Sequence, residues 1–285
     1  MRAARPKQWI KNGLVLAAPA LGGALGTADG LASALIALVA FTLASAGTYL
    51  INDARDAEAD RLHPVKRLRP IAAGTVSVRT GYTVGGLLMI GALVLGALTL
   101  PHAFLGVLAA YLIVTLLYMA GVKDVPIWEM AFVAAGFVLR LVGGGAATGT
   151  RLSGWFLVVG GATAFFIVVT KRKAEIAELE LGASRHRPSL AGYSHDILLV
   201  AQAVSFAVAI TAYALWSFTG TATAGASIWL ELSIVPLFMI MLRFGQQAEV
   251  AKVSAPEEIL FRDPQLVTMI VLWLVLVVVG TGIHS

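Results

Sequence analysis

The sequence contains no cysteine, and only 13% of its 285 residues are charged. The absence of cysteine excludes disulfide frameworks, zinc knuckles, iron–sulfur sites and thiol nucleophiles. An apolar content of 58% and a mean hydropathy of +0.84 argue strongly against a water-soluble fold, in which about 25% of residues are charged. The chain also lacks a Walker loop, a dinucleotide fingerprint and a His-Glu-x-x-His pair, so soluble nucleotide-enzyme templates do not fit. These observations indicate a polytopic membrane protein.

Long apolar runs make up most of the chain. A helix needs about 20 mostly apolar residues to cross a hydrocarbon core of about 30 Å. By this criterion the sequence predicts an all-α polytopic integral membrane protein with about nine transmembrane helices. The predicted spans are 9–26, 31–51, 82–100, 103–121, 127–147, 155–170, 197–218, 228–244 and 266–283.

The distribution of basic residues predicts the orientation. Long polar segments at 52–79, 171–196 and 245–264 alternate with very short ones, and a cytoplasmic N-terminus places 19 of the 21 Lys and Arg residues on the cytoplasmic side. The positive-inside rule therefore predicts a cytoplasmic N-terminus and an external C-terminus. We expect a multi-pass protein of the plasma (inner) membrane.

A cleavable signal peptide over 1–24 is the alternative interpretation of the N-terminus. Against it, Trp9, Lys11 and Asn12 lie where an anchor at the membrane interface would lie. Cleavage would also leave eight spans whose orientation must start outside.

Four oxygen-bearing side chains follow the second predicted span, namely Asn52, Asp53, Asp56 and Asp60. If the helix continues through them, Asn52, Asp56 and Asp60 lie within an arc of about 80°, and Asp53 lies about 60° from Asp56. An Asp at the bilayer centre costs about 2.5–3.5 kcal/mol, so the group must lie at a water-filled cytoplasmic mouth. Clustered carboxylates favour a bound cation, and hard oxygen ligands suit Mg²⁺.

Cationic side chains come directly after this acidic group. They are His63, Lys66, Arg67 and Arg69. Pro64 and Pro70 stop the helix, so that the chain turns back over the acidic face. A solvated helix end that pairs with Arg55 and Arg61 is the simpler interpretation. Metal ligands beside phosphate-binding cations favour a diphosphate site instead.

Three motifs resemble a known family. The first aspartate-rich motif of the UbiA superfamily of intramembrane prenyltransferases is similar to Asn52-Asp53-x-x-Asp56-x-x-x-Asp60. The branch of decaprenyl-phosphate phosphoribosyltransferases has runs similar to Arg5-Pro6-Lys7-Gln8-Trp9-x-Lys11-Asn12 and His63-Pro64-x-Lys66-x-x-Arg69-Pro70-Ile71-Ala72-x-Gly74. This resemblance implies one UbiA-like transmembrane domain over 1–285, whose helices surround a central cavity. It also implies that the polar segments 52–79 and 171–196 form an active-site cap.

The second long polar segment separates the branches. Superfamily members that ionise a prenyl diphosphate usually carry a second aspartate pair there, whereas this sequence reads Lys171-Arg172-Lys173-Ala174-Glu175-Ile176-Ala177-Glu178. Three cations beside one or two carboxylates bind anions better than they bind a second metal. The loop from Arg185 to Tyr193 adds donors. Ordinary positive-inside basicity is the competing explanation, above all for Lys173 and Arg185.

The resemblance implies an Mg²⁺-dependent pentosyltransferase. This enzyme moves 5-phosphoribose from 5-phosphoribosyl 1-diphosphate to a polyprenyl (decaprenyl) phosphate, releases diphosphate, and supplies a lipid-linked pentose for cell-wall arabinan synthesis. The expected partners are these two substrates and the bilayer, without nucleic acid, and the glycine-rich helix faces permit a homo-oligomer.

The same resemblance implies roles for individual residues. The expected catalytic residues are Asp56, Asp60, Lys66 and Arg69. The expected metal ligands are Asn52, Asp53, Asp56, Asp60 and Glu175. The expected substrate-binding residues are Lys7, Gln8, Lys11, Asn12, Lys66, Arg69, Lys171, Arg172, Arg187 and Tyr193.

Two other functions stay open. One is an aromatic prenyltransferase that uses a polyprenyl diphosphate. The other is an anion or lipid transporter, which would need charged or broken-helix sites near the midplane, whereas nearly all ionisable residues here lie at one mouth.

Three smaller features carry expectations of their own. Arg140, inside a predicted span, either lines the cavity or serves the structure, and Glu129 lies about 16 Å away along the helix, too far to pair with it there. His63 either contacts phosphate or caps a turn. Gly81 and Gly85, four residues apart, predict a close approach of two helix backbones.

Overall fold

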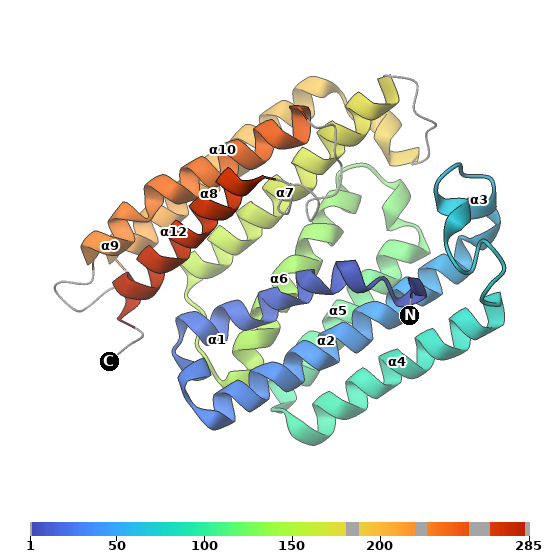
Figure 1. Cartoon of the computed structure of the whole chain (residues 1–285), viewed down its shortest axis with the longest axis horizontal. Helices are drawn as coiled ribbons and strands as arrows, with labels where there is room; N and C mark the ends of the chain where they lie inside the picture. Colours follow the sequence, from blue (N-terminus) through green and yellow to red (C-terminus); the bar gives the residue numbers. More distant parts are fainter. Residues whose placement is uncertain (1, 181–187, 220–226, 251–262, 283–285) are drawn as a thin grey trace. The chain divides into compact units, whose positions relative to one another are not determined.

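A computed structural model describes residues 2–180, 188–219, 227–250 and 263–282 (Figure 1). These residues form helices and connecting turns, and no strand occurs among them. The chain divides into two compact units. The first comprises Met1–Lys123 and Leu139–Arg151, and the second comprises Asp124–Val138 and Leu152–Ser285.

Eight helical segments of the described chain are long and apolar enough to cross a membrane, which makes the protein a multi-pass integral membrane protein. They correspond to the second through ninth predicted spans. They are α2 (Ala28–Arg55), α4 (Val78–Thr99), α5 (His102–Ala120), α6 (Trp128–Thr148), α7 (Gly154–Glu180), α8 (His195–Thr219), the consecutive α9 (Ser227–Leu232) and α10 (Ile234–Val250), and α12 (Pro264–Thr281). The all-helical membrane fold is confirmed, and the central cavity stays a prediction.

The first predicted span is a broken element instead of one α-helix. It consists of η1 (Arg2–Ala4), η2 (Pro6–Leu16), α1 (Ala17–Leu21) and η3 (Ala24–Gly26), in which η denotes a 3₁₀-helix. Pro19 has no N–H to donate to the Val15 carbonyl, and Gly23 takes a left-handed backbone (φ 72°). Hydropathy recognised the apolar run, but Pro19 and Gly23 interrupt its C-terminal part, and the 3₁₀-helix η2 forms the part before them.

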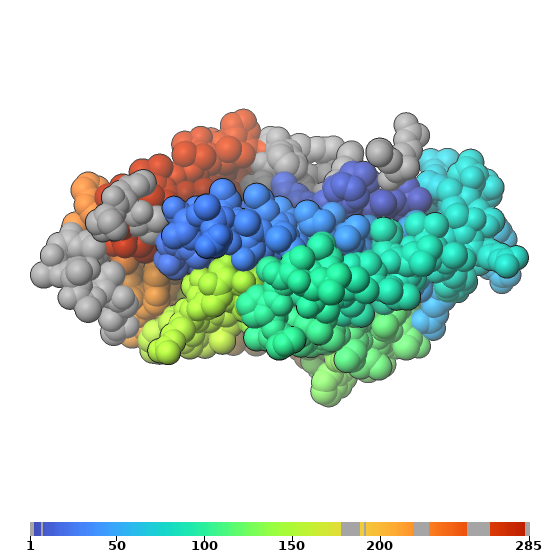
Figure 2. Space-filling view, turned by 90° about the horizontal axis from the view of Figure 1, so that it is seen from below, coloured from blue at the N-terminus to red at the C-terminus, as the bar shows by residue number. Residues whose placement is uncertain are grey.

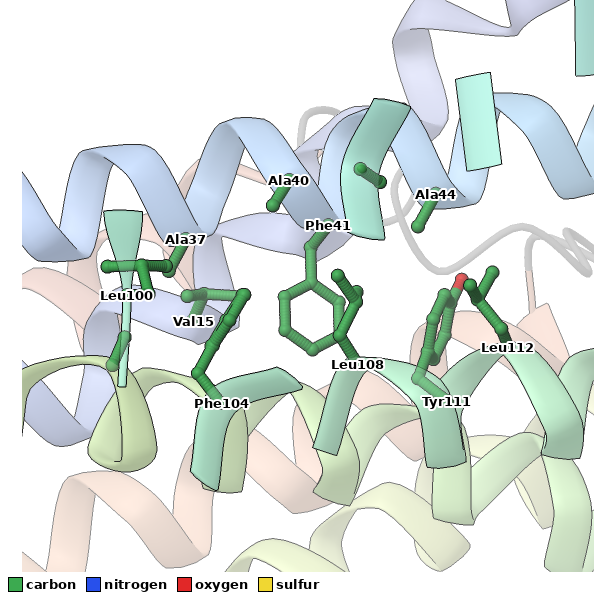
Figure 3. Close-up of a cluster of buried hydrophobic side chains, with 12 residues drawn as sticks. Val15, Ala37, Ala40, Phe41, Ala44, Leu100, Phe104, Leu108, Tyr111 and Leu112 are labelled. Carbon is green, nitrogen blue, oxygen red and sulfur yellow. The ribbon is translucent and has the colours of Figure 1, made fainter. Parts of the chain in front are cut away.

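The core of the first unit forms around Phe41 of α2. The small side chains of Ala37, Ala40 and Ala44 flank it, so that the rings of α5 reach the α2 backbone (Figure 3). Phe104 meets Phe41 edge to face at a ring-centroid distance of 5.8 Å, and the centroid of the Tyr111 ring lies 5.3 Å from that of Phe41. Such edge and tilted geometries are the favourable ones for aromatic pairs.

Helices α2 and α4 pack closely through glycine, as the Gly81 and Gly85 spacing predicts. A Cβ atom on Gly85 would lie 2.9 Å from the Gly47 carbonyl oxygen, and one on Gly47 would lie 2.6 Å from the Gly85 oxygen. On its other side α4 presents a stripe of apolar side chains, and its teal surface is part of the face shown in Figure 2. The stripe consists of Leu87, Ile90, Val94 and Leu98, each about half or more exposed. This is the arrangement that a lipid-facing helix requires.

The second unit is built on the pairing of α7 with α8, whose core includes Ala164, Val168 and Leu198. Helix α7 runs to Glu180, ten residues beyond the predicted end of the sixth span. The interpretation of residues 171–180 as part of the loop after the sixth span is therefore corrected, and the role of the polar segment 171–196 in an active-site cap stays a prediction. The cations of this stretch are helical, and two of them are buried.

A side-chain cap starts α12. The Asp263 carboxylate accepts hydrogen bonds from the N–H groups of Gln265 (3.0 Å) and Leu266 (3.4 Å), and Pro264 takes the first helical position. Arg243 Nε donates to the same carboxylate at 2.7 Å. This hydrogen bond holds the pKa of Asp263 below its usual value.

The glycine contact between α2 and α4 gives a test of the packing. Gly85→Ala should destabilise the protein by about 1–3 kcal/mol, because the new methyl group meets backbone atoms of α2. The matched control is Gly86→Ala, since a Cβ there has no neighbour within 4 Å and alanine favours the helix by about 1 kcal/mol. Thermal unfolding in detergent measures both, and equal midpoints for the two variants would contradict the packing.

Candidate active site

The acidic group lies where α2 ends. Helix α2 ends at Arg55, and α3 (Ala57–Arg61) begins after the single residue Asp56. The helical hydrogen-bond pattern passes through the junction, because Asp56 N–H donates to the Asn52 carbonyl (2.9 Å) and Asp60 N–H donates to the Asp56 carbonyl (2.8 Å). The predicted helix therefore continues with a break at Asp56.

Asp53 and Asp60 converge on one guanidinium group. Arg69 Nη1 lies 3.2 Å from Asp53 Oδ1 and 2.6 Å from Asp60 Oδ2. Both carboxylates are buried, with residue exposures of 2% and 4%, so their charges need a close counterion. The turn predicted after Pro64 brings the chain back over the acidic face, and in the structure Arg69 contacts this face directly.

Asp56 points to a different cation. Lys123, at the end of the turn after α5, donates to both of its carboxylate oxygens at 2.8 and 3.0 Å. Arg5, just before η2, donates to Asp53 Oδ1 and lies over the Tyr49 ring at 5.1 Å. Neither cation was predicted as a site residue. Arg5 lies inside a motif quoted for the resemblance, whereas nothing in the sequence connects Lys123 with Asp56.

Arg55 and Arg61, the partners expected for a simple salt-bridged helix end, donate to backbone carbonyl groups. Arg55 donates to the carbonyl groups of Met119 and Ala120 at the end of α5, and Arg61 donates to the Ala72 carbonyl at 3.3 Å. These contacts hold the C-terminal end of α5 and the turn before α4. Counterions for the acidic group come instead from Arg69 after the turn and from Arg5 and Lys123, which are distant in sequence.

His63 caps the turn that leads to Arg69. Its Nδ1 accepts from the N–H groups of Val65 (3.2 Å) and Lys66 (3.3 Å). The short helix η4 (Lys66–Leu68) follows, and Arg69 then takes an extended backbone before Pro70. Of the two roles open for His63, the turn cap is the one that these contacts describe.

The predicted substrate-binding residues of the N-terminal segment all lie on η2. Lys11 Nζ donates to Gln8 Oε1, and Lys7 lies in the first turn of the helix. Asn12 is fully buried and bonded to Thr42, Ser45 and Arg140. A contact of these residues with substrate stays a prediction.

A second charged group lies in the second unit. Arg172 is 1% exposed, and its Nε and Nη2 donate to Glu129 Oε1 and Oε2 at 2.5 and 2.8 Å. Its Nη1 donates to Glu175, which also lies 3.8 Å from Lys171 Nζ. Glu129 thus pairs with Arg172 on another helix. The role of Glu175 in metal binding stays a prediction.

Tyr193 joins this group from the connection before α8. Its hydroxyl accepts from the N–H of Ile127 at 2.6 Å and donates to Glu129 Oε1 at 3.3 Å. Burial raises the pKa of the phenol to about 12, and the Glu129 carboxylate adds to this shift while the Ile127 N–H offsets part of it. The phenol therefore stays protonated at neutral pH. The predicted site residue Arg187 lies outside the described residues.

Lys173 is more than a surface cation. It is 7% exposed and donates to Gln202 Oε1 (2.8 Å) and Glu249 Oε1 (2.6 Å). These contacts tie α7 to α8 and α10. The competing explanation of ordinary positive-inside basicity does not account for these contacts of Lys173.

The donor set at the end of α2 fits a divalent cation. Asp53 and Asp60 aim their carboxylates at one positive charge, and Asn52 directly precedes Asp53 on α2. Carboxylate and amide oxygens are the ligands that Mg²⁺ prefers. Within the described residues, no three His, Asp or Glu side chains are arranged as a ready metal cluster. The carboxylates are paired with cations instead.

Comparison with known proteins connects this geometry to a family. A family model described as the UbiA prenyltransferase family matches residues 14–262. The chain belongs to this family. The match includes α2, the acidic group and the charged part of α7.

Two curated relatives and one solved structure show the extent of the similarity. The decaprenyl-phosphate phosphoribosyltransferases of Mycolicibacterium smegmatis and Corynebacterium glutamicum are each 36% identical to this chain, covering 96% and 99% of it and 89% and 86% of their own lengths. A UbiA homologue from Archaeoglobus fulgidus, solved bound to GPP and Mg²⁺, is 18% identical with a TM-score of 0.71, covering 99% of this chain and 98% of that one. At this identity the solved structure shows a shared fold.

The buried Arg172 pair provides a second test. Arg172→Met should destabilise the protein by about 3–5 kcal/mol, because Glu129 would remain as a buried charge that has lost its bidentate partner. Lys171→Met, one residue earlier and 33% exposed at the side chain, should change stability by about 0–1 kcal/mol. Thermal unfolding midpoints compare them. Arg172→Met as stable as Lys171→Met would show that the ion pair does not hold this unit together.

Proposed function

We propose that this protein transfers 5-phosphoribose from 5-phosphoribosyl 1-diphosphate to decaprenyl phosphate or another polyprenyl phosphate, with release of diphosphate. The observation that carries this proposal is the 36% identity, over nearly full length, to decaprenyl-phosphate phosphoribosyltransferases. The product would supply a lipid-linked pentose for cell-wall arabinan synthesis.

The reaction exchanges one bond to the anomeric carbon of ribose for another. The bond from C1 to the diphosphate oxygen breaks and its electron pair leaves with diphosphate, while an oxygen of the lipid phosphate forms a new bond to C1. Positive charge develops on the ribose ring and negative charge on the leaving group. Cations that face the leaving group therefore stabilise the transition state more than the ground state.

The first unit offers such cations beside its carboxylates. We assign Lys66 and Arg69 to the departing diphosphate, since Arg69 already lies in the acidic group and Lys66 lies three residues before it. Asn52, Asp53, Asp56 and Asp60 would hold Mg²⁺, which when bound would offset the charge of the diphosphate. Glu175 is the further ligand that the resemblance implies.

The acceptor needs no general base. A phosphate monoester has a second pKa of about 6, so the lipid phosphate is largely ionised at pH 7 and already nucleophilic. In the second unit, Lys171 and Arg172, with Arg187 and Tyr193, are the residues we assign to substrate phosphates. Lys7, Gln8, Lys11 and Asn12 of the N-terminal segment complete the predicted binding set.

The location of the site follows from its two substrates. A polyprenyl chain leaves the bilayer only at about 0.8 kcal/mol per CH₂ group, so the lipid phosphate must react at the membrane surface. Phosphoribosyl diphosphate is soluble and enters from water. We therefore propose a plasma-membrane enzyme, with segments 52–79 and 171–196 capping an active site that faces the cytoplasm.

Prenyl transfer to an aromatic acceptor is the second candidate, and the family description favours it. Against it, the stretch from Lys171 to Glu178 carries three cations and no aspartate where prenyl-diphosphate enzymes usually hold a second metal. An assay that separates the two functions therefore has to vary the donor diphosphate and the acceptor together.

Radiolabel transfer by the purified protein separates the two candidates. With polyprenyl phosphate, Mg²⁺ and labelled phosphoribosyl diphosphate, the label should enter the lipid fraction, and EDTA should stop the transfer. If no label enters the lipid while a prenyl diphosphate is consumed in the presence of an aromatic acceptor, the protein is a prenyltransferase instead.

The acidic group has its own mutational test. Asp60→Asn and Asp56→Asn should each lower the rate of label transfer by at least about 100-fold, because a ligand of the cation that stabilises the leaving group is lost. Glu58→Gln, exposed and on the same short helix, is the matched control and should leave the rate within about twofold. Full activity in both aspartate variants, with normal membrane insertion, would remove this assignment.

A further inference from the structure

A buried polar network in the first unit joins Asn12, one of the proposed binding residues, to Arg140, which has no role in the function proposed above. Its centre is Arg140 of α6, which is 6% exposed. Arg140 Nε donates to Asn12 Oδ1 at 2.8 Å, and Nη2 donates to the Tyr111 hydroxyl at 2.9 Å. The guanidinium group also lies over the Tyr111 ring, 4.7 Å from its centroid. One side chain thus connects η2, α5 and α6.

Asn12 extends this network to α2. Its Nδ2 donates to Thr42 Oγ1 at 3.2 Å and to Ser45 Oγ at 3.0 Å, while its Oδ1 accepts from Arg140. Its side chain is fully buried. Both amide hydrogens and the oxygen of Asn12 therefore have partners, which fixes its position against two helices at once.

The helix that carries Asn12 needs such support. Helix η2 is a 3₁₀-helix of 11 residues, whereas 3₁₀ runs longer than about four residues are uncommon. At its beginning Arg5 binds Asp53 on α2, and near its end Asn12 binds Thr42 and Ser45 on the same helix. The segment is therefore held at two points.

The spacing of these two points matches a 3₁₀-helix. The seven residues from Arg5 to Asn12 rise about 14 Å in 3₁₀ form and about 10.5 Å in α form. On α2, Asp53 lies about 12 Å from Ser45 and about 16.5 Å from Thr42 along the axis. The 3₁₀ length falls between the two spacings, and the α-helical length is shorter than both.

We infer that Asn12 and Arg140 form an anchor that keeps η2 in its extended 3₁₀ form and thereby positions Arg5 beside Asp53. In this role Asn12 and Arg140 are positioning residues. The anchor also sets the height of Lys7 and Gln8 relative to the acidic group. The anchor itself rests on the contacts above, and its effect on catalysis rests on the proposed phosphoribosyl transfer.

Thiol accessibility tests the anchor without an activity assay. The chain has no cysteine, so Ala3→Cys introduces a single reporter, at a partly buried position that packs against the cluster of Leu50, Ala54, Ala57 and Ile71. When Arg140→Met or Asn12→Ala is added, η2 should relax and the rate of maleimide modification should rise by about tenfold. Thr75→Cys, exposed in the same unit, is the matched control, and its rate should not change.

Two outcomes of this assay overturn the inference. One is an unchanged rate at Ala3→Cys in both anchor variants. The other is an equal increase at Ala3→Cys and Thr75→Cys, which would mean general unfolding. If Arg140→Met does not fold, Tyr111→Phe removes one hydrogen bond of the network and should raise the Ala3→Cys rate by a smaller factor. No increase there would also overturn the anchor.

Kinetics then tests the effect on catalysis. Arg140→Met should raise KM for phosphoribosyl diphosphate by about tenfold while kcat stays within about threefold, because binding residues shift and the reacting groups remain. Arg140→Lys keeps the charge and should recover part of the loss. A fall in kcat alone would contradict the positioning role. An inactive parent enzyme would reject the proposed function and leave the thiol assay to decide on the anchor.

Discussion

The structure depends on one electrostatic arrangement, the sharing of the Arg69 guanidinium by Asp53 and Asp60. Two buried carboxylates at the end of a membrane helix repel each other and lose the hydration that water would give them. Arg69 and Arg5 balance these charges from either side of the sequence. The turn after α3 brings Arg69 to these carboxylates, and the N-terminal segment along α2 brings Arg5. Both arrangements are needed to neutralise the buried acidic group.

The same principle recurs throughout the described parts of the chain. Buried charges are paired across elements, as Arg172 is with Glu129, and Lys173 with Glu249. Arg140 is held by Asn12 and Tyr111. Each of these contacts joins side chains of different helical elements. Polar contacts thus supply the specificity of packing that hydrophobic contact lacks within a bilayer.

Hydropathy was sufficient to predict eight spans and the acidic segment, because both depend on local composition. The long 3₁₀-helix η2 was not predictable, since it depends on contacts that Arg5 and Asn12 make with α2. The extension of α7 was missed because its cations are typical of a loop. The partner that Lys173 has in the fold, Glu249, lies 76 residues later in the sequence. Lys123 was missed for the same reason, as its partner Asp56 precedes it by 67 residues.

A map of the protein with phosphoribosyl diphosphate and Mn²⁺ bound, with the ion located by its anomalous scattering, is the most direct test of the account. We expect an ion held by the acidic group of Asn52, Asp53, Asp56 and Asp60, with Arg69 turned from Asp53 and Asp60 to the diphosphate. An ion bound elsewhere, or the diphosphate found away from the end of α2 while Arg69 keeps both carboxylates, would contradict it.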